Sequence, residues 1–290
     1  MPARWEADGA RAEYCFATTQ DEEQDVTTLK ANGIDIYYRQ EGTGPDLLLI
    51  MGLGAHSGAW LLNAPALAKR FRVTTFDNRG TGRTSAPDEP YSIRGMAGDT
   101  AALMDGLGIA RAHIVGASMG GMIAQELAIN YPEKIDRLVI ACSRAKAGEL
   151  RKRIAIAQRA LWEADIPRDV MAAIQQPWGS TSAILQDEHL PMERLALAAK
   201  DPYPVQKHAY LRQLDATIAF DTTDRLGKIT APTLVLVGAE DILTPPFESA
   251  ELARAIPGAE MRVLPRGGHG FAAEYPAEFN RAVAAFLART

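Results

Sequence analysis

A serine with a glycine two residues to each side is the residue of this sequence best suited to chemistry. Ser118 lies in the motif Gly-Ala-Ser-Met-Gly at 116–120, between an apolar run at 113–115 and a helix-forming run at 119–130. A serine at the tip of a strained strand-to-helix turn needs small neighbours, because larger side chains would collide. The amino terminus of the helix also favours a developing negative charge. The motif therefore predicts an activated, nucleophilic serine.

A serine hydroxyl is a poor nucleophile at neutral pH, so the predicted chemistry requires a base within hydrogen-bond reach. We favour His269 among the five histidines, because it lies in a glycine-rich loop after the last predicted strand. His56 is the main alternative, since it follows the glycine loop of the first predicted parallel strand. His113 begins a buried strand and is expected to be structural. His189 and His208 lie in a predicted helical insertion, at its surface or beside the substrate.

An acid must orient the base, and Asp241 is the carboxylate with the most suitable position. It follows the predicted strand 233–237 in the loop Gly-Ala-Glu-Asp, and it precedes the candidate histidine along the chain. The order Ser, Asp, His is one in which such triads occur in parallel-sheet hydrolases. Glu240 is adjacent and spacing alone does not exclude it, whereas Asp136 is more typical of a surface charge.

Acyl transfer also requires two hydrogen-bond donors for the oxyanion of the tetrahedral intermediate. The backbone N–H of Met119 should supply one, because it follows the nucleophile. The loop after the first parallel strand, residues 50–56, should supply the other, and we select the N–H of Leu53. The glycines Gly52 and Gly54 in that loop are equally consistent with a simple tight turn.

The hydrophobic pattern predicts the elements that must position these residues. A hairpin is expected from Val26–Lys30 and Ile34–Arg39 around Asn32-Gly33, a strong turn signal. Continuous apolar runs then alternate with helical patterns, which is typical of a parallel sheet buried on both faces. The predicted strands are 47–51, 73–76, 113–115, 138–142, 233–237 and 261–264. The predicted helices are 92–107, 119–130, 247–255 and 276–289.

Three kinds of segment are expected along the chain. Residues 1–25 are polar and acidic and read as a leader, while 26–144 and 226–290 form the α/β core. Residues 145–225 are amphipathic and helical without a convincing strand, and they are too long for a simple connection. We expect them to form a helical cap over the carboxyl edge of the sheet, where ligands of open α/β sheets bind.

Composition narrows the class of partner and the compartment. The 290 residues carry a formal charge of −5 and a pI near 5.6, which argues against a nucleic-acid partner. Two cysteines, Cys15 and Cys142, cannot form a disulfide framework and do not have metal-ligand spacing. The start lacks a signal-peptide pattern, and no apolar run approaches the length of a membrane span. A soluble, cytoplasmic protein is expected, with its oligomeric state left open.

These features together resemble the α/β-hydrolase superfamily from about residue 26 to residue 290. The resemblance is carried by Gly-Ala-Ser-Met-Gly at 116–120, Gly-Ala-Glu-Asp at 238–241, Gly-His-Gly at 268–270 and Asp-Asn-Arg-Gly-Thr-Gly-Arg-Thr at 77–84. It implies an α/β-hydrolase fold with a mostly parallel sheet, flanking helices and a helical cap. The family often has His-Gly in the oxyanion loop, whereas this chain has Met51-Gly52, which keeps the backbone donors. The pattern looks most like capped esterases and lactonases of the 3-oxoadipate enol-lactonase and aminoacrylate-hydrolase kind.

Three residues are candidates for substrate contact. Trp60 follows the oxyanion loop, Arg144 follows the strand that ends at Cys142, and Trp162 lies in the insertion. Arg144 could anchor an anionic substrate. The basic cluster at 151–153 is expected to be a solvated helix face. The insertion also carries the aromatic residues Trp178, Tyr203 and Tyr210.

The sequence thus predicts a serine hydrolase for a small-molecule ester or lactone. Ser118 would attack the carbonyl, His269 would act as base and then acid, and Asp241 would orient it, with no metal or organic cofactor. A hydrolase of carbon–carbon bonds in ring-cleavage products is an alternative, because it can use the same triad. A ligand receptor with this fold and little turnover is an alternative of another class.

Overall fold

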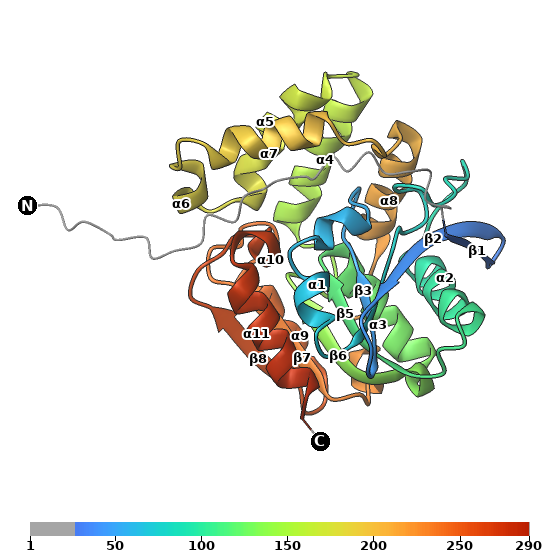
Figure 1. The fold of residues 1–290 in the computed structure, drawn as a ribbon. Coiled ribbons are helices and arrows are strands. Elements are labelled where there is room, and N and C mark those ends of the chain that lie inside the picture. The colour runs from blue at the N-terminus through green and yellow to red at the C-terminus, as the bar shows by residue number, and fades with distance from the viewer. Residues whose placement is uncertain (1–26, 290) are drawn as a thin grey trace, which may run out of the picture.

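A computed structural model describes residues 27–289 and contains one sheet of eight strands (Figure 1). The strand order is β1-β2-β4-β3-β5-β6-β7-β8. The strands are β1 (Thr28–Ala31), β2 (Ile34–Glu41), β3 (Asp46–Ile50), β4 (Arg72–Phe76), β5 (Ala112–Ala117), β6 (Ile135–Ala141), β7 (Thr233–Gly238) and β8 (Glu260–Leu264). The expected leader, residues 1–25, lies outside the described residues.

The fold opens with the expected antiparallel hairpin. Asn32 and Gly33 form its turn with positive φ angles of 48° and 81°, a conformation that these two residue types adopt readily. β1 pairs with β2 so that Ala31 lies opposite Ile34, and β2 then pairs antiparallel with β4. Every further pairing, from β4–β3 to β7–β8, is parallel.

The central strands are buried on both faces, as their uninterrupted apolar runs predict. Leu48 and Ile50 of β3 face one hydrophobic core, and Leu47 and Leu49 face the other. All four side chains are fully buried. Successive residues of a strand point to opposite faces, so an unbroken apolar run supplies both cores. Each such leucine contributes about 1.5–3 kcal/mol to the free energy of unfolding.

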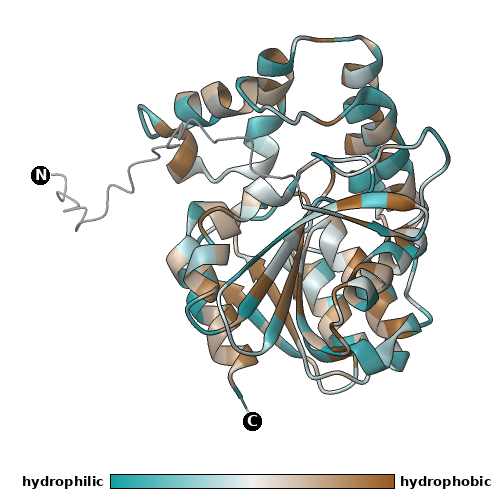
Figure 2. Ribbon diagram, turned by 45° about the vertical axis from the view of Figure 1, so that its right-hand side comes forward, coloured by the Kyte–Doolittle hydropathy of each residue, from teal (hydrophilic) through white to brown (hydrophobic). Residues whose placement is uncertain are grey.

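Helices cover both faces of the sheet, and the brown apolar strands of Figure 2 lie between them. Apolar residues of α2, α3 and α9 fill one core, and those of α1 and α11 fill the other. Those five helices and the short α10 are α1 (Ala64–Leu67), α2 (Ile93–Gly106), α3 (Met119–Asn130), α9 (Pro246–Ala255), α10 (Phe271–Glu274) and α11 (Pro276–Leu287). Among residues 27–289, 3₁₀ helices lie in the connections at Ser57–Trp60, Pro132–Lys134 and Leu226–Lys228.

A group of helices follows β6 and precedes β7 in the chain, and it forms a layer above the sheet (Figure 1). They are α4 (Glu149–Glu163), α5 (Arg168–Gly179), α6 (Ser182–Leu185), α7 (Leu190–Ala199) and α8 (Lys207–Ala219). Lys146 and Asp221 form an isolated bridge where this segment leaves and rejoins the core. α8 joins the two layers, because Ala209 and Ala216 belong to the main core. None of the described helices has the length and apolar character that spanning a bilayer requires.

The topology brings the loops after β3 and β5 together. β3 pairs with β4 on one side and with β5 on the other, so the chain crosses over β3 between β4 and β5. The carboxyl ends of parallel strands meet at one edge, and a reversal in strand order opens a crevice there. The loops that follow β3, β5, β7 and β8 therefore face the helical layer.

Candidate active site

Ser118 occupies the turn between β5 and α3 in a strained backbone conformation. Its φ and ψ angles are 57° and −118°, outside the regions that residues with a Cβ atom ordinarily adopt. The Ser118 N–H donates to the Ala141 carbonyl at 2.9 Å, and its own carbonyl accepts from the Ser143 hydroxyl at 2.9 Å. The last residue of β6 and Ser143, just beyond it, thus fix both sides of the strained residue.

The two motif glycines are required by close backbone contacts at this turn. A Cβ atom on Gly116 would lie 2.2 Å from the Gly120 carbonyl oxygen, and one on Gly120 would lie 2.0 Å from the Ile50 carbonyl oxygen. Both distances are far inside van der Waals contact, and backbone atoms cannot rotate away. The spacing of the motif therefore reflects the packing of the turn against itself and against β3.

His269 and Asp241 complete a linear array with this serine. The distance from His269 Nε2 to Ser118 Oγ is 2.8 Å, and the distances from His269 Nδ1 to the two Asp241 oxygens are 2.9 and 3.2 Å. Asp241 follows β7 and His269 follows β8, so three separate strand ends supply the array. A nucleophile, a base and an orienting acid in this order can transfer a proton during acyl transfer.

The environment of Asp241 keeps its carboxylate ionised. Burial opposes ionisation, since only 3% of the residue is exposed, but the His269 charge and several hydrogen bonds outweigh it and lower the pKa. The amides of Leu243 and Thr244 donate to Oδ1, both at 2.9 Å, and the Thr244 hydroxyl donates to Oδ2 at 2.7 Å. A carboxylate with this many donors can stabilise an imidazolium next to it.

The loop that carries His269 is held by a buried glutamate. Glu274 accepts hydrogen bonds from the Gly268 amide at 2.9 Å and from the Thr181 amide at 3.1 Å. The Gly270 amide donates to the Gly179 carbonyl at 2.8 Å. The histidine loop is therefore tied to the helical layer as well as to the sheet. Glu274 was not among the predicted site residues, because nothing in its local sequence separates it from a surface acid.

The two predicted oxyanion donors border the same space. Met119 begins α3 next to the serine, and Leu53 follows β3; both line the cavity that contains Ser118. Within the part of the chain that the structure describes, neither backbone amide donates a hydrogen bond to another group. The side chain of Gln213 accepts from the Gly54 amide at 2.9 Å and so braces the second loop.

The alternative histidines have other partners. His56 Nε2 lies 3.2 Å from Asp201 in the helical layer, and His208 Nε2 lies 2.9 Å from the Ala86 carbonyl oxygen. His113 is buried, 3.3 Å from Asp136, and burial lowers its pKa. His189 is exposed.

The alternative acids are likewise away from the array. The side chain of Glu240 is exposed, although the residue adjoins Asp241. Asp136 is 47% exposed and engaged with His113 and Arg111. The structure thus places neither acid against His269.

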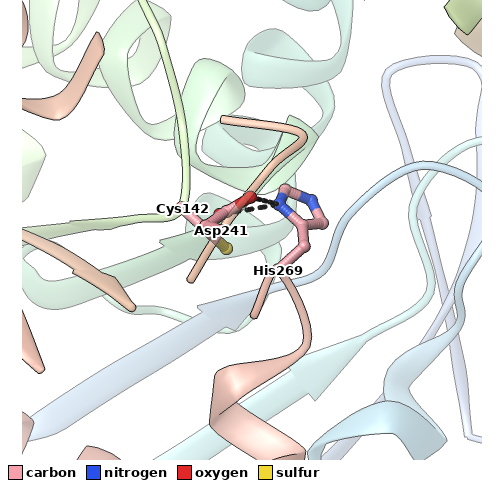
Figure 3. Close-up of side chains that lie close together, drawn as sticks. All are labelled: Cys142, Asp241 and His269. Atoms are coloured by element: carbon pink, nitrogen blue, oxygen red, sulfur yellow. Dashed lines mark hydrogen bonds and ion pairs between the residues drawn. The ribbon is translucent and has the colours of Figure 1, made fainter. Parts of the chain in front are cut away.

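Cys142 lies beside the Asp241 and His269 side chains (Figure 3). One potential ligand atom from each of the three residues lies within 4.8 Å of the others, a spacing that could hold a metal ion. Burial raises the pKa of the Cys142 thiol well above its usual range, and a neutral thiol is a poor metal ligand. The carboxylate and imidazole are already bonded to each other. Proton transfer therefore explains the grouping better than metal binding.

A cavity of about 360 Å³ lies between the sheet edge and the helical layer. Ser118 and His269 reach it from the sheet, and Arg151 and Tyr210 reach it from the helices above. Apolar side chains, among them Met122, cover much of the remaining wall. A space of this size suits a small molecule, and the serine hydroxyl is accessible from it.

Comparison with known proteins identifies the family of the chain. A family model described as the alpha/beta hydrolase fold matches residues 45–275. The chain belongs to the α/β-hydrolase family. It is 34% identical over 260 residues to RutD of Azorhizobium caulinodans, a candidate carbamate hydrolase, covering 87% of this chain and 94% of that protein.

Two solved hydrolases are similar to the structure. The enol-lactonase of Burkholderia xenovorans LB400 has a TM-score of 0.83 and 28% identity, covering 91% of this chain and 100% of that one. The meta-cleavage product hydrolase of Pseudomonas fluorescens IP01 has a TM-score of 0.77 and 27% identity, covering 90% and 97%. The predicted family and fold class are confirmed.

Two of the predicted substrate contacts lie outside the cavity wall of this hydrolase. Trp60 is 1% exposed and packs against Phe279 of α11, with ring centroids 6.0 Å apart, so that prediction is wrong. Trp162 lies behind the wall and stacks on Tyr210 at 4.4 Å, so it supports a lining residue rather than lining the cavity itself. Arg144 lines the cavity, and its contact with a substrate stays a prediction.

The prediction that residues 151–153 form a solvated helix face is only partly correct. Lys152 and Arg153 are exposed, but Arg151 is 6% exposed and lines the cavity. Successive residues of a helix lie about 100° apart, so a basic run need not share one environment. The start of α4 turns Arg151 inward because α4 packs on α8 above the sheet edge.

Proposed function

We propose that this chain is a serine hydrolase that cleaves a small-molecule carboxylic ester or lactone through an acyl-enzyme. The observation that carries the proposal is the 2.8 Å contact between Ser118 Oγ and His269 Nε2, with Asp241 behind the imidazole. Its setting supports the same function, since the serine stands on a strained turn at the wall of a cavity.

In the first half of the reaction, Ser118 Oγ attacks the substrate carbonyl and His269 Nε2 takes its proton. The buried Asp241 carboxylate stabilises the imidazolium that results. The amides of Met119 and Leu53 bind the oxyanion in the largely apolar cavity, where such hydrogen bonds are strong. His269 then protonates the leaving alkoxide. In a lactone, this alkoxide stays attached to the acyl group.

In the second half, water attacks the acyl-enzyme and His269 serves as base again. The proton then returns to Ser118 Oγ as the product leaves. Each proton moves between His269 Nε2 and an oxygen atom, so this array completes the cycle without a second proton donor.

A hydrolase of carbon–carbon bonds is the second candidate, favoured by the similarity to the meta-cleavage product hydrolase. The same serine and histidine could serve that reaction, but the carbon leaving group must be protonated before the bond breaks. Vinylogous diketones are substrates of that reaction, whereas simple aliphatic esters and lactones test the principal proposal.

Steady-state hydrolysis of p-nitrophenyl esters of increasing chain length, and of simple lactones, tests the proposal. The parent should turn over repeatedly, and Ser118→Ala should reduce kcat by about 10⁶-fold, as loss of the nucleophile does in other serine hydrolases. A burst of nitrophenol equal to the enzyme concentration, with an acyl adduct on Ser118, would identify the intermediate.

The alternatives give different results in the same assays. A folded parent inactive on every ester and lactone but active on vinylogous diketones would replace the principal proposal by the carbon–carbon reaction. One slow turnover, with a ligand-dependent rise in thermal stability, would indicate a receptor. Activity that survives Ser118→Ala would contradict all of these assignments except a receptor with adventitious hydrolysis.

A further inference from the structure

Two buried arginines line the cavity that contains Ser118. Arg144 follows β6 and Arg151 lies near the start of α4, and only 3% and 6% of these residues are exposed. They come from the sheet edge and from the helical layer, respectively. Guanidinium groups are seldom buried this deeply unless an anion accompanies them.

Neither arginine has an acidic partner in the described part of the chain. Arg144 donates one long hydrogen bond, from Nη2 to the Thr217 carbonyl oxygen at 3.4 Å, and its Nε has no partner. Arg151 forms no ion pair with another described residue, and its Nη1 is buried without an acceptor. Donors left in this state lower stability, because water is lost and nothing replaces it.

Glu248 compensates the charges of the two arginines only weakly. Glu248 at the start of α9 interacts electrostatically with both arginines but forms no ion pair with either among residues 27–289. Burial raises its pKa to about 7, so this carboxyl is partly protonated at neutral pH. Burial and the charge of Arg151 lower the pKa of Arg144 to about 10, which leaves it protonated. The region around the arginines therefore retains a positive charge.

We infer that Arg144 and Arg151 bind an ionised carboxylate of the substrate, so that this hydrolase acts on esters or lactones that carry a free carboxyl group. The inference rests on the function proposed above and specifies its substrate class. A carboxylate offers two oxygens in one plane, which match the paired donors of a guanidinium group. Their unpaired nitrogens then gain the acceptors that the protein does not supply.

The rest of the cavity fits such a molecule. Met51, Met122 and Leu243 contribute apolar surface between the array and the helical layer. This surface suits a short carbon chain that joins the carboxylate to the scissile carbonyl. When the carboxylate belongs to the acyl part, water adds across the acyl–oxygen bond and the products are a dicarboxylic acid and an alcohol.

Paired substrates measure this preference directly. We would compare kcat/KM for p-nitrophenyl hydrogen adipate and p-nitrophenyl hexanoate, which have acyl chains of six carbons but differ in the terminal carboxylate. The parent should favour the adipate ester. The ratio of the two kcat/KM values should fall by about 10- to 100-fold in Arg144→Met and in Arg151→Met, the loss expected for a charged hydrogen-bonding partner.

Arg153→Met is the matched control, because Arg153 lies two residues farther along the same helix and is exposed. It removes the same charge from α4 without touching the cavity. Its adipate-to-hexanoate ratio should equal that of the parent. An equal fall in Arg153→Met and Arg151→Met would assign the effect to the net charge of the protein and overturn the inference.

Thermal stability supplies a second readout. If Arg151 only stabilised the fold, Arg151→Met would lower the Tm. Arg151→Met should raise Tm without ligand, because an unpaired buried cation is replaced by an apolar side chain of similar length. Free adipate should raise the Tm of the parent but not that of Arg151→Met. Inorganic phosphate at the same concentration should raise the Tm of the parent by less than adipate does.

The outcomes separate this inference from the proposed function. A parent that hydrolyses hexanoate esters without favouring adipate, and whose Tm does not respond to adipate, overturns the carboxylate site and leaves the serine hydrolase intact. A parent with no esterase activity overturns the function, while an adipate shift that Arg151→Met abolishes still supports the site. A larger shift with phosphate than with adipate overturns the assignment to a carboxylate.

Discussion

The strained backbone at Ser118 leads to a prediction about stability that is independent of any substrate. Ser118→Ala and Ser118→Gly both remove the hydroxyl that we propose as the nucleophile, so both should be inactive. They differ in the Cβ atom, which is the cause of the strain at φ 57° and ψ −118°. Ser118→Gly should therefore be the more stable of the two variants.

The size of the difference follows from two opposing effects. A residue with a Cβ atom in such a sparsely populated region costs about 1–3 kcal/mol, and glycine relieves most of this cost. Glycine also gives the unfolded chain more freedom, which lowers stability by about 0.4–1 kcal/mol. The free energy of unfolding should therefore be about 1 kcal/mol higher for Ser118→Gly than for Ser118→Ala.

Urea unfolding of the two variants at one pH measures this difference. Ala157→Gly, introduced into Ser118→Ala, is the control, because Ala157 is exposed in the middle of α4 and has ordinary helical geometry. There the same alanine-to-glycine change should destabilise the protein by about 1 kcal/mol. A Ser118→Gly variant that is equal to or less stable than Ser118→Ala would refute the strain argument.

Two further predictions concern carboxyl groups. Asp241→Asn should lower kcat for p-nitrophenyl esters by about 10⁴-fold, because an amide no longer stabilises the imidazolium of His269; a loss below tenfold would mean that another acid acts. Glu248→Gln should stabilise the protein against urea more at pH 8.5 than at pH 5. The pKa of Glu248 is raised from 4.5, the value expected in the unfolded chain, to about 7 in the folded protein. The parent therefore loses stability as the pH rises from 4.5 through 7, because the buried carboxyl must ionise. The difference should reach up to about 3 kcal/mol, and equal effects of the substitution at both pH values would contradict the burial of this carboxyl.

Much of the fold could be predicted because its signals are local. The apolar runs of β3, β5, β6 and β7 were recognisable as strands, since strands buried on both faces need no alternation. The array of Ser118, Asp241 and His269 could be predicted for a related reason. Each residue follows a predicted strand, and parallel strands bring their carboxyl ends to one edge.

The order of the strands in the sheet could not be predicted from such local signals. Hydrophobic periodicity identifies a strand but does not say which strands are its neighbours, and a crossover leaves no local trace. Only the tertiary structure shows that β3 lies between β4 and β5, which places the loop after β3 beside Ser118. Supporting residues such as Glu274 and Gln213 depend on the tertiary structure, because Thr181 and Gly54, which donate hydrogen bonds to them, are distant in the chain.

The sequence by itself determined the elements, the family resemblance and the residues proposed for acyl transfer, because glycine spacing and strand ends are local properties. The tertiary structure alone decided which other side chains face the substrate. Trp60 is a predicted substrate contact but packs on α11, and Arg151 lies in a run predicted to be solvated but lines the cavity. The physical reason is that helical periodicity shows which residues share a face, whereas burial depends on what that face packs against.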